Sequence, residues 1–304
     1  MNNIVLTKAS VFRNVKDYKF SPKLEENKRT EIAEKVKKAL NLPTMNVQEI
    51  ETSVLNYLKN YNLIEKQAGQ IMLKKEANVV INLFAGEHIT ITSSAVNFNS
   101  SVINNAIGLA HELDGKLTAA YSDQYGFLMS NLQNVGCGLK LECLINLFAI
   151  KTIGKIEQVK QNVKNLGYAL HDYAGDVYCL STICNLGKTE SEIIAEFEKM
   201  AIKLQELEIE SAKMLSATNS DQFMDKVFRS LAILKSAHLL DLTELSMHLS
   251  MIRLGNNLDF ISLTPSAINE LQVLALNKMA LSSKADALEL ARKVRNILKG
   301  ENNV

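Results

Sequence analysis

The segment Gly136-Cys137-Gly138 contains residue types that could bind a phosphate group. Successive backbone N–H groups near the start of a helix attract anions, and a glycine-flanked loop can present them. A structural turn is the simpler interpretation of the same residues, and we favour it. This segment alone therefore does not establish a phosphate site.

Three side chains could take part in proton or group transfer. Cys137 could be a nucleophile, but its neighbours are apolar, and a packed thiol is the commoner state of such a cysteine. His88 and His171 could titrate near neutral pH. These residue types alone do not establish a catalytic group.

Composition excludes several classes of protein. The 304 residues are 47% hydrophobic, which is enough for one large core or two modest ones, and the formal net charge is +1. This near-neutral balance favours neither nucleic-acid nor membrane-surface binding. No apolar run reaches the roughly 18 residues that a membrane-spanning helix needs. We therefore expect no nucleic-acid partner and no membrane association.

The cysteines point to a reducing compartment. Cys137, Cys143, Cys179 and Cys184 lack the paired spacing of metal ligands, and the N-terminus does not resemble a signal peptide. We predict a cytoplasmic protein without a metal.

Hydrophobic periodicity predicts a mixed first part. Residues 24–41 and 47–61 carry apolar side chains at helical spacing, whereas residues 71–94 change to β-branched runs separated by short turns. An α+β domain follows, with an antiparallel sheet flanked by helices. Further strands are predicted at 117–122, 127–130, 168–172 and 177–183, and further helices at about 98–114, 139–150 and 155–166.

The second part of the chain is predicted to be helical. A stretch rich in Ser, Thr and Asn at 216–220 suggests a boundary, with one domain at 1–216 and an all-α domain at 217–304. Apolar residues three and four apart predict helices at 189–217, 221–238, 241–254, 264–280 and 283–299.

Residues 125–140 read Y-G-F-L-M-S-N-L-Q-N-V-G-C-G-L-K. This segment resembles a catalytic loop of the ATP:guanidino phosphotransferases, most closely that of the bacterial protein-arginine kinases, which reads approximately G-Y-L-T-S-C-P-T-N-V-G-T-G-L-R. The resemblance places Asn131 at the family's reactive cysteine. It places Lys140 at a phosphate-binding arginine.

The N-terminal residues 3–14 carry the same resemblance. They are similar to the family's I-V-L-S-S-R-I-R-L-A-R-N with one residue deleted. This alignment places Ala9, Ser10 and Val11 at R-I-R and retains Arg13 alone, as a remnant of the phosphate site.

Residues 84–91 are similar to the family's N-E-E-D-H-I-R-I. The resemblance places Gly86 at a glutamate that binds the guanidinium and Thr90 at another arginine of the phosphate clamp. His88 matches the family's histidine, but the two glutamates that the family has shortly before it are absent. We therefore favour a hydrogen bond that supports the fold over a catalytic role for His88.

The resemblance continues to the end of the chain. Residues 169–176 are a shortened counterpart of V-R-G-x-x-G-E-G, with His171 at the arginine and Asp176 as a weak substitute for the glutamate. The stretches that follow track L-G-K-S-E-Q-D-I, D-R-V-Y-R-S-Y-G-V-L and R-L-G in order, at residues 186–193, 225–234 and 253–255.

The chemistry of phosphoryl transfer makes these replacements consequential. The reaction depends on positioning and on neutralising charge at the phosphate oxygens, mostly by metal ions and arginines. A guanidinium holds two phosphate oxygens at once, which Lys140 replaces only in part. Carboxylates orient the acceptor guanidinium and take its proton, and Gly86 can do neither. The resemblance therefore implies a site from which the family's catalytic groups are absent.

The C-terminal part of the family carries a phosphoarginine-binding motif of the form R-D-x-x-R-A. The corresponding residues 285–291 read A-D-A-L-E-L-A, which retains Asp286 and lacks both arginines. Phosphoarginine would find no bidentate partner there. Asp286 is thus a remnant of that site.

The sequence as a whole favours a catalytically degenerate relative of the protein-arginine kinases. It would act by binding a protein, either an active kinase paralogue or a component of the stress-response and proteolysis pathway of that family, and would need no cofactor. One alternative is an active ATP:guanidino phosphotransferase that uses Mg-ATP in a rearranged site. Another is a sensor of nucleotide or phosphoarginine without turnover.

The helical region is predicted to form a homodimer or a heterodimer with the paralogue. Its amphipathic helices offer more apolar surface than one small bundle needs to bury. The apolar stripe on which this rests contains Leu239, Leu240, Leu245, Leu249 and Ile252.

Overall fold

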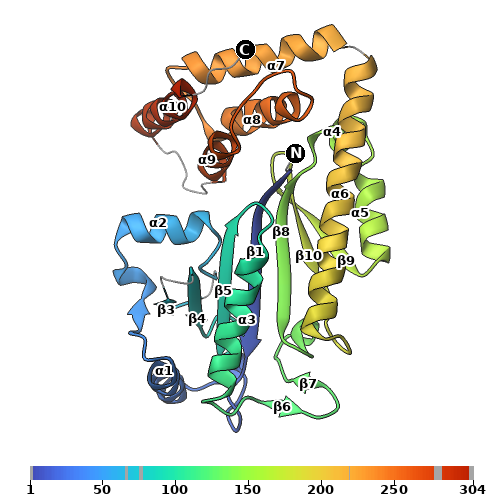
Figure 1. Cartoon of the computed structure of the whole chain (residues 1–304). Coiled ribbons are helices and arrows are strands. Elements are labelled where there is room, and N and C mark those ends of the chain that lie inside the picture. Colours follow the sequence, from blue (N-terminus) through green and yellow to red (C-terminus); the bar gives the residue numbers. More distant parts are fainter. Residues whose placement is uncertain (1–2, 66–67, 75–77, 219, 277–282, 301–304) are drawn as a thin grey trace. The chain divides into compact units, whose positions relative to one another are not determined.

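The computed structural model describes residues 3–65, 68–74, 78–218, 220–276 and 283–300 (Figure 1). They divide into two compact units. The first unit comprises Met1–Val5, Leu144–Leu180 and Met200–Val304, and the second comprises Leu6–Cys143 and Ser181–Lys199.

The central element is an eight-stranded antiparallel sheet. Its strand order is β2-β3-β4-β5-β1-β8-β10-β9, so the N-terminal strand β1 lies in the interior of the sheet. The bounds are β1 (Ile4–Arg13), β2 (Met45–Asn46), β3 (Gln70–Lys74), β4 (Val79–Leu83), β5 (Ile89–Val96), β8 (Leu139–Asn146), β9 (Tyr168–Ala174) and β10 (Val177–Thr182).

The pairing of β1 with β5 gives the second unit two different sheet faces. It runs without interruption from Leu6 opposite Val96 to Arg13 opposite Ile89. Because cross-strand partners share a face and neighbours alternate, the side chains fall into two sets. We call one set the polar face; it contains Lys8, Ser10 and Phe12 of β1, Asn82 of β4, and Thr90, Thr92 and Ser94 of β5.

The opposite face packs against α3 (Ser100–Asp114) and is mostly apolar. Ala9, Val11 and Ile91 are fully buried on it. Asn99 caps the start of the helix, because its side chain accepts a hydrogen bond from the backbone N–H of Ser101. Figure 1 shows α3 lying along β5 within this unit.

The predicted surface helices of the second unit are present. Residues 24–41 contain α1 (Glu26–Leu40), which begins after the short turn η1 (Ser21–Lys23). Residues 47–61 contain η2 (Val47–Glu49) and α2 (Thr52–Asn60). The predicted strands at 117–122 and 127–130 are reduced to the two-residue hairpin strands β6 (Tyr121–Ser122) and β7 (Gly126–Phe127). The turn η4 (Leu132–Asn134) follows.

The predicted helix at 139–150 is wrong. Residues Leu139–Asn146 form β8, and only Phe148–Thr152 is helical, as α4. The reason is visible in the burial of β8, where Leu139, Leu141 and Cys143 are buried and Lys140 lies between them half-exposed. This is the period of two that belongs to a strand.

The first unit contains α5 (Ile156–Asn165) and the C-terminal part of α6 (Glu190–Thr218). Glu208 of α6 is buried and accepts hydrogen bonds from the backbone N–H groups of Ala149, at 2.7 Å, and Ile150, at 3.0 Å. These N–H groups belong to the first turn of α4, which leaves them without helical partners. Glu208 therefore fastens α4 to α6.

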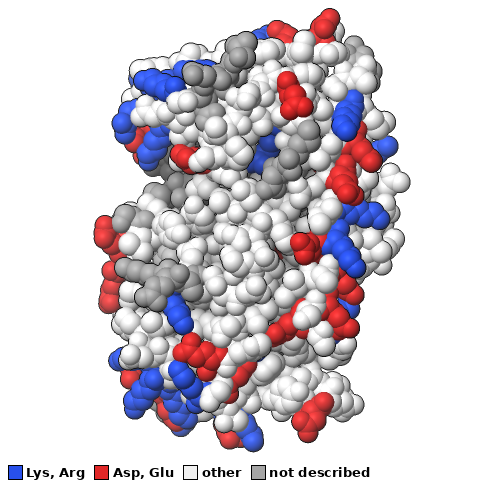
Figure 2. Space-filling model, in the orientation of Figure 1, with Lys and Arg blue, Asp and Glu red and all other residues white. Residues whose placement is uncertain are grey.

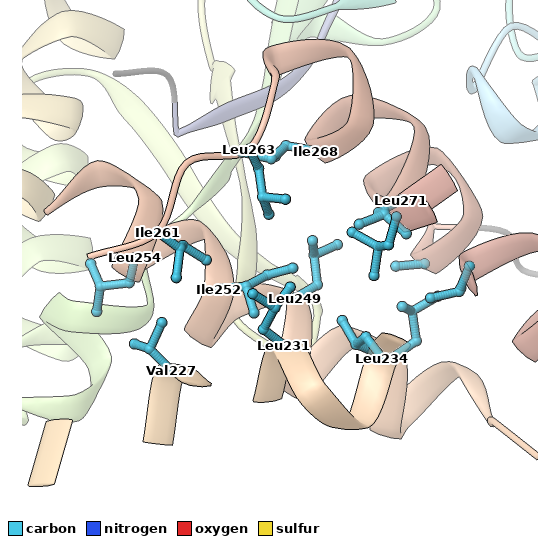
Figure 3. Packing of buried hydrophobic residues seen from close by; sticks show 14 of the residues in the cluster. Val227, Leu231, Leu234, Leu249, Ile252, Leu254, Ile261, Leu263, Ile268 and Leu271 are labelled. Atoms are coloured by element: carbon cyan, nitrogen blue, oxygen red, sulfur yellow. The ribbon is translucent and has the colours of Figure 1, made fainter. Parts of the chain in front are cut away.

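The C-terminal helices α7 (Ser220–Ser236), α8 (Leu242–Asn257), α9 (Pro265–Ala275) and α10 (Lys284–Lys299) pack into one core. Figure 3 shows the buried side chains of the first three helices gathered between them. The apolar stripe proposed for dimerisation is mostly used in this core, because Leu240, Leu245, Leu249 and Ile252 are buried within the chain. That part of the dimer argument was wrong.

One predicted helix and the absence of membrane spans can be compared only with the described residues. The predicted helix at 264–280 extends beyond the described part of the chain, which ends at 276 before resuming at 283. No helix among the described residues is both long and apolar enough to cross a membrane. The cytoplasmic location stays a prediction.

Candidate functional site

The residues proposed from the sequence fall in both units. Arg13, Gly86, His88, Asn131 and Lys140 belong to the second unit. His171 and Asp286 belong to the first. The second unit therefore contains most of the residues proposed from the sequence.

Arg13 is buried at the end of β1, and its guanidinium serves the fold. Nε and Nη2 donate to the two carboxylate oxygens of Asp114 at 2.8 and 2.9 Å, in a bidentate ion pair with α3. Nη1 donates to the carbonyl oxygens of Phe12, at 2.8 Å, and Cys137, at 3.2 Å. The guanidinium carbon also lies 3.5 Å from the centre of the Phe127 ring. This arginine is therefore committed to internal contacts.

His88 is likewise held by the backbone on both ring nitrogens. Nδ1 accepts from the N–H of Val15 at 3.0 Å, and Nε2 lies 2.8 Å from the carbonyl oxygen of Lys19. Since a carbonyl only accepts, the proton of the neutral ring lies on Nε2. Burial lowers the pKa of His88 below its usual value. The geometry supports a fold-supporting role for this histidine.

Glu87 is a functional contact that sequence analysis missed. Its buried carboxylate accepts from the side chain of Asn14 at 2.6 Å and from the backbone N–H groups of Ser130 and Asn131, each at 3.0 Å. From the turn that precedes β5, it thereby holds the start of the 130–138 loop in place. The available signal was that Glu87 matches the aspartate of N-E-E-D-H-I-R-I.

Asn131 and Gly86 occupy turns near this carboxylate. The side chain of Asn131 accepts from the backbone N–H of Gln133 at 3.0 Å and so caps η4. Gly86 has φ +96°, a conformation that a side chain rarely adopts, and its carbonyl accepts from Ser130 Oγ at 3.1 Å. An amide cap and a glycine supply neither a thiol nor a carboxylate.

The glycines of the 136–138 segment allow close backbone packing. A Cβ on Gly136 would lie 2.7 Å from the carbonyl oxygen of Asn185, and one on Gly138 would lie 2.8 Å from that of Phe12. The carbonyl of Gly138 also accepts from the N–H of Phe12 at 2.8 Å. These contacts support the structural turn that we favoured over a phosphate cradle.

Cys137 is not an activated thiol. Burial raises its pKa above the ordinary value, and the nearby carboxylate of Glu190 acts in the same direction. A catalytic cysteine needs the opposite shift, because the thiolate is the nucleophile. The raised pKa of this partly buried cysteine supports a packed thiol.

Lys140 belongs to an ion-pair network on the polar face. Its Nζ lies 2.7 Å from Oε1 of Glu142, whose Oε2 lies 3.5 Å from Nζ of Lys8. Lys8 Nζ also lies 2.8 Å from Oε1 of Glu65. We call these four residues the Lys8 network. Its two lysine cations and two glutamate carboxylates together carry no net charge.

The Lys8 network favours the charged forms of Lys8 and Glu142. Burial alone would lower the pKa of Lys8, but the carboxylates of Glu142 and Glu65 outweigh it and raise this pKa to about 12. Burial would likewise raise the pKa of Glu142, but Lys8 and Lys140 hold it below its ordinary value. The positive charge on this face is therefore already neutralised.

Residues 61–65 lie against the polar face, and we call them the covering segment. Asn82 accepts a hydrogen bond from a backbone N–H of this segment and donates one to a backbone carbonyl, each at 3.0 Å. Ser94 donates to a second carbonyl of the segment. Together with the ion pair of Lys8, these bonds fasten the segment across β4, β5 and β1.

The strand register favours a different alignment of the family's R-I-R. Arginines that clamp one phosphate chain must converge on one face, and Thr90 lies on the polar face. Ala9 and Val11 point to the opposite face, whereas Lys8 and Ser10 share the face of Thr90. Since β1 has no bulge in this pairing, Lys8 and Ser10 are the better counterparts of the two arginines. The deletion then falls before them.

The hydroxyls at these positions cannot replace arginines. Oγ of Ser10 and Oγ1 of Thr90 are buried and have no hydrogen-bond partner among the described residues. A hydroxyl on a short side chain lacks both the charge and the two-pronged reach of a guanidinium. At the positions on the polar face that match the family's arginines, the positive charge comes from Lys8 and Lys140.

The two candidates of the first unit have separate surroundings. His171 is exposed on the edge strand β9. Asp286 forms a capping box at the start of α10, in which its carboxylate accepts from the N–H of Ser283 at 3.0 Å. This cap is a sufficient structural reason for Asp286.

A magnesium–nucleotide complex does not fit the residues on the polar face. Its phosphates would meet the carboxylates of Glu65 and Glu142, while the lysines that could attract them are paired. Nor does any group of three or more His, Cys, Asp or Glu side chains in the described ranges have the arrangement to hold a metal ion. The arrangement is suited to holding the sheet together.

Two family models match consecutive parts of the chain. Residues 18–211 match the ATP:guanido phosphotransferase, C-terminal catalytic domain. Residues 220–302 match the Protein-arginine kinase McsB C-terminal domain.

Similar proteins agree with these matches. The chain is 24% identical over 268 residues to the protein-arginine kinase of Staphylococcus haemolyticus (strain JCSC1435), covering 86% of this chain and 80% of that protein. It is 25% identical over 268 residues, with the same coverage, to the protein-arginine kinase of Staphylococcus aureus (strain USA300).

Solved structures share the fold at lower identity. The substrate-free duplicated taurocyamine kinase from Schistosoma mansoni has a TM-score of 0.61 and 18% identity, over 88% of this chain and 40% of that chain. Lombricine kinase has a TM-score of 0.58 and 17% identity, over 71% and 67%. The predicted fold, an antiparallel sheet flanked by helices and followed by a helical region, is thus confirmed. The chain belongs to the ATP:guanido phosphotransferase family and is a homologue of the protein-arginine kinase McsB.

Proposed function

We propose that this chain is a catalytically degenerate homologue of the protein-arginine kinases and acts by binding another protein. Its partner would be an active kinase paralogue, or a component of the stress-response and proteolysis pathway to which the family resemblance points. No cofactor is required for this role.

The observation that carries the proposal is the Lys8 network. An active site for phosphoryl transfer needs positive charge that remains available to the phosphates as charge develops in the transition state. Here Lys8 and Lys140 are satisfied by Glu65 and Glu142 within the fold. Removing a single group of this kind typically costs a hundredfold or more in rate, and several are replaced together.

The acceptor side of the site supports the same conclusion. Gly86 stands where the family has a glutamate, and Asn131 stands where it has a cysteine. Both residues make hydrogen bonds within turns, and the carboxylate of Glu87 accepts hydrogen bonds from the backbone of the 130–131 turn. The loop keeps its shape through backbone contacts that do not depend on catalysis, which explains how it can persist without the reactive side chains.

A protein-binding role needs exposed apolar side chains, and the second unit has several near the degenerate loop. Leu132 in η4 is 81% exposed, and Tyr121 on β6 is 57% exposed. Large apolar side chains that stay exposed in this way are typical of contact surfaces when they cluster. We propose the β6–β7 hairpin and η4 as the part that contacts the partner.

The helical region is proposed to dimerise through side chains outside its own core. Phe228 on α7 and Met247 on α8 are 47% and 55% exposed. The dimer proposal therefore depends on Phe228 and Met247, because most of the apolar stripe at 239–252 is buried within the chain. A two-fold contact is the commonest arrangement for such a surface.

Arginine phosphorylation is the direct test of lost catalysis. The purified chain is incubated with Mg-ATP and casein, with an active protein-arginine kinase in a parallel reaction. We expect mass spectrometry to find phosphoarginine in the parallel reaction only. Phosphoarginine above the level of a no-enzyme control would instead support an active enzyme with a rearranged site.

A further inference from the structure

A cavity of about 400 Å³ lies in the second unit, between α1 and the β2 edge of the sheet. Its volume falls within the range of small-molecule sites. It is formed apart from the Lys8 network, and none of the residues proposed from the sequence lines it. Its lining includes Glu26, Arg29, Glu34, Thr44, Gly69 and Phe84.

One wall of the cavity is a single face of α1. The spacing of Glu26, Arg29, Thr30, Ala33 and Glu34 is i, i+3, i+4, i+7 and i+8, which places all five on one side of the helix. This face offers charges of both signs. Figure 2 shows basic and acidic side chains gathered together over α1, at the lower left of the view.

Arg29 has hydrogen-bonding capacity that the fold leaves unused. Its Nη2 donates to the carbonyl of Ser21 at 3.5 Å, the limit of a hydrogen bond, and its Nε is buried with no hydrogen-bond partner in the described ranges. The contact of Nε with the carboxylate of Glu26 is long, at 3.8 Å. A guanidinium carries five N–H donors in a fork that suits a carboxylate.

Phe84 lies near this arginine and has a strained backbone. Its φ is +60°, in the left-handed region, which a bulky residue rarely adopts and which costs on the order of 1–3 kcal/mol. The centre of its ring lies 5.6 Å from the guanidinium carbon of Arg29. Such strain is often found at binding sites.

The opposite wall supplies uncharged polar groups and free space. Oγ1 of Thr44 is buried and lacks a hydrogen-bond partner among the described residues. Gly69 lines the cavity, and a Cβ built on it would meet no atom within 4 Å. Glu34, on the α1 wall, contacts Lys37 at 3.3 Å but keeps a second carboxylate oxygen.

We propose that this cavity binds a free amino acid. The ligand's carboxylate would pair with Arg29, and its ammonium would face Glu34 and Glu26. The site thus selects a small zwitterion, because a simple anion would take up Arg29 without making use of the free carboxylate oxygen of Glu34. The cavity does not include the residues that match the family's catalytic site. This inference is therefore tested independently of the proposed function.

Calorimetric titration of the whole chain with each free amino acid tests the proposal. We expect at least one to bind with sub-millimolar affinity. Its N-acetyl derivative and its amide should each bind about tenfold more weakly, since each loses one charge-assisted pair. No binding by any amino acid overturns the proposal. Equal binding of acetate or inorganic phosphate would define an anion site and would also overturn it.

Three variants locate the site. Arg29→Gln should weaken binding about tenfold, and Glu34→Gln, at an exposed position that does not threaten folding, by about threefold or more. Gly69→Leu fills the cavity without changing charge and should abolish binding. The control Lys38→Gln changes a charge elsewhere on α1, because Lys38 does not line the cavity. Wild-type affinity in both Gly69→Leu and Glu34→Gln would place the ligand elsewhere and contradict the assignment.

Discussion

Arg13 and Asp114 form a bidentate ion pair that joins the end of β1 to the end of α3, with Nε–Oδ1 and Nη2–Oδ2 distances of 2.8 and 2.9 Å. In the sequence, Arg13 is the retained arginine of a catalytic motif. In the structure it is buried beneath the ring of Phe127 and holds the glycine loop by the carbonyl of Cys137. Its retention is therefore explained by stability.

Replacing Arg13 should lower stability. Arg13→Ala leaves Asp114 without its partner and frees two carbonyl groups, so we expect a loss of about 3 kcal/mol in the free energy of unfolding. Urea unfolding measures it. The control Arg229→Ala breaks an exposed pair with Asp225 and should cost less than about 1 kcal/mol. Equal stability of the two variants would mean that the buried pair contributes little.

Releasing the lysines of the Lys8 network should restore anion affinity. In a Glu65→Gln/Glu142→Gln double variant, Lys8 and Lys140 lose their partners, and we expect inorganic pyrophosphate to bind about tenfold more tightly than to the wild type. The single variant Glu142→Gln keeps the contact between Lys8 and Glu65 and should show a smaller gain in pyrophosphate affinity. It replaces the double variant in the experiment if the double variant is unstable.

A matched control for this experiment lies on α3. Glu112→Gln removes a carboxylate that pairs with Lys74 and Lys116 away from the polar face. It should leave pyrophosphate affinity unchanged. If the control variant gains as much as Glu142→Gln, which removes the same single charge, the effect is one of net charge, and the interpretation of the network fails.

Glu208 should make stability depend on pH. Burial raises its pKa to about 7, against the opposing effect of the two backbone donors at the start of α4. The folded state therefore holds a proton that the unfolded state releases between about pH 4.5 and 7. The resulting stabilisation is fully present below about pH 4.5 and is lost as pH rises through 7.

Comparison with Glu208→Gln isolates this contribution. The difference in unfolding free energy between wild type and variant should favour the wild type by more at pH 5 than at pH 8, on the order of 1–3 kcal/mol. Urea unfolding at the two pH values measures both proteins. An identical difference at pH 5 and pH 8 would show that Glu208 does not titrate in this range.

The proposed dimer can be tested through its exposed apolar residues. Light scattering of the wild type at micromolar concentrations should give the mass of a dimer, and Phe228→Ser or Met247→Ser should weaken association about tenfold or more. Leu166→Ser replaces another exposed apolar residue and serves as the control. A monomeric wild type that also forms no complex with a kinase paralogue would remove the dimer proposal.

Local sequence patterns predicted the helices well. The apolar positions Ile32, Val36 and Leu40 predicted a helix at 24–41, and α1 spans Glu26–Leu40. The helix predicted at 283–299 becomes α10 at Lys284–Lys299, with Ser283 as its cap. The patterns failed for β1, which is buried on both faces. Such a strand shows no simple alternation of apolar and polar residues, so no strand was predicted there.

The site was harder to predict because its contacts are distant in sequence. The family motif identified Arg13 and Lys140, but not their partners. Asp114 lies on a helix far along the chain from Arg13, and Glu65 reaches Lys8 only because the covering segment crosses the sheet. The register of β1 was needed to decide which residues replace the family's arginines.

Titration of the whole chain with Mg-ATP by isothermal calorimetry tests the central claim most directly. Because Lys8 and Lys140 are neutralised within the fold and Ser10 and Thr90 carry no charge, we predict no magnesium-dependent binding at sub-millimolar nucleotide. Sub-millimolar binding that requires magnesium and is lost in Lys140→Ala would contradict the account, since it would show that the polar face still accepts the nucleotide phosphates.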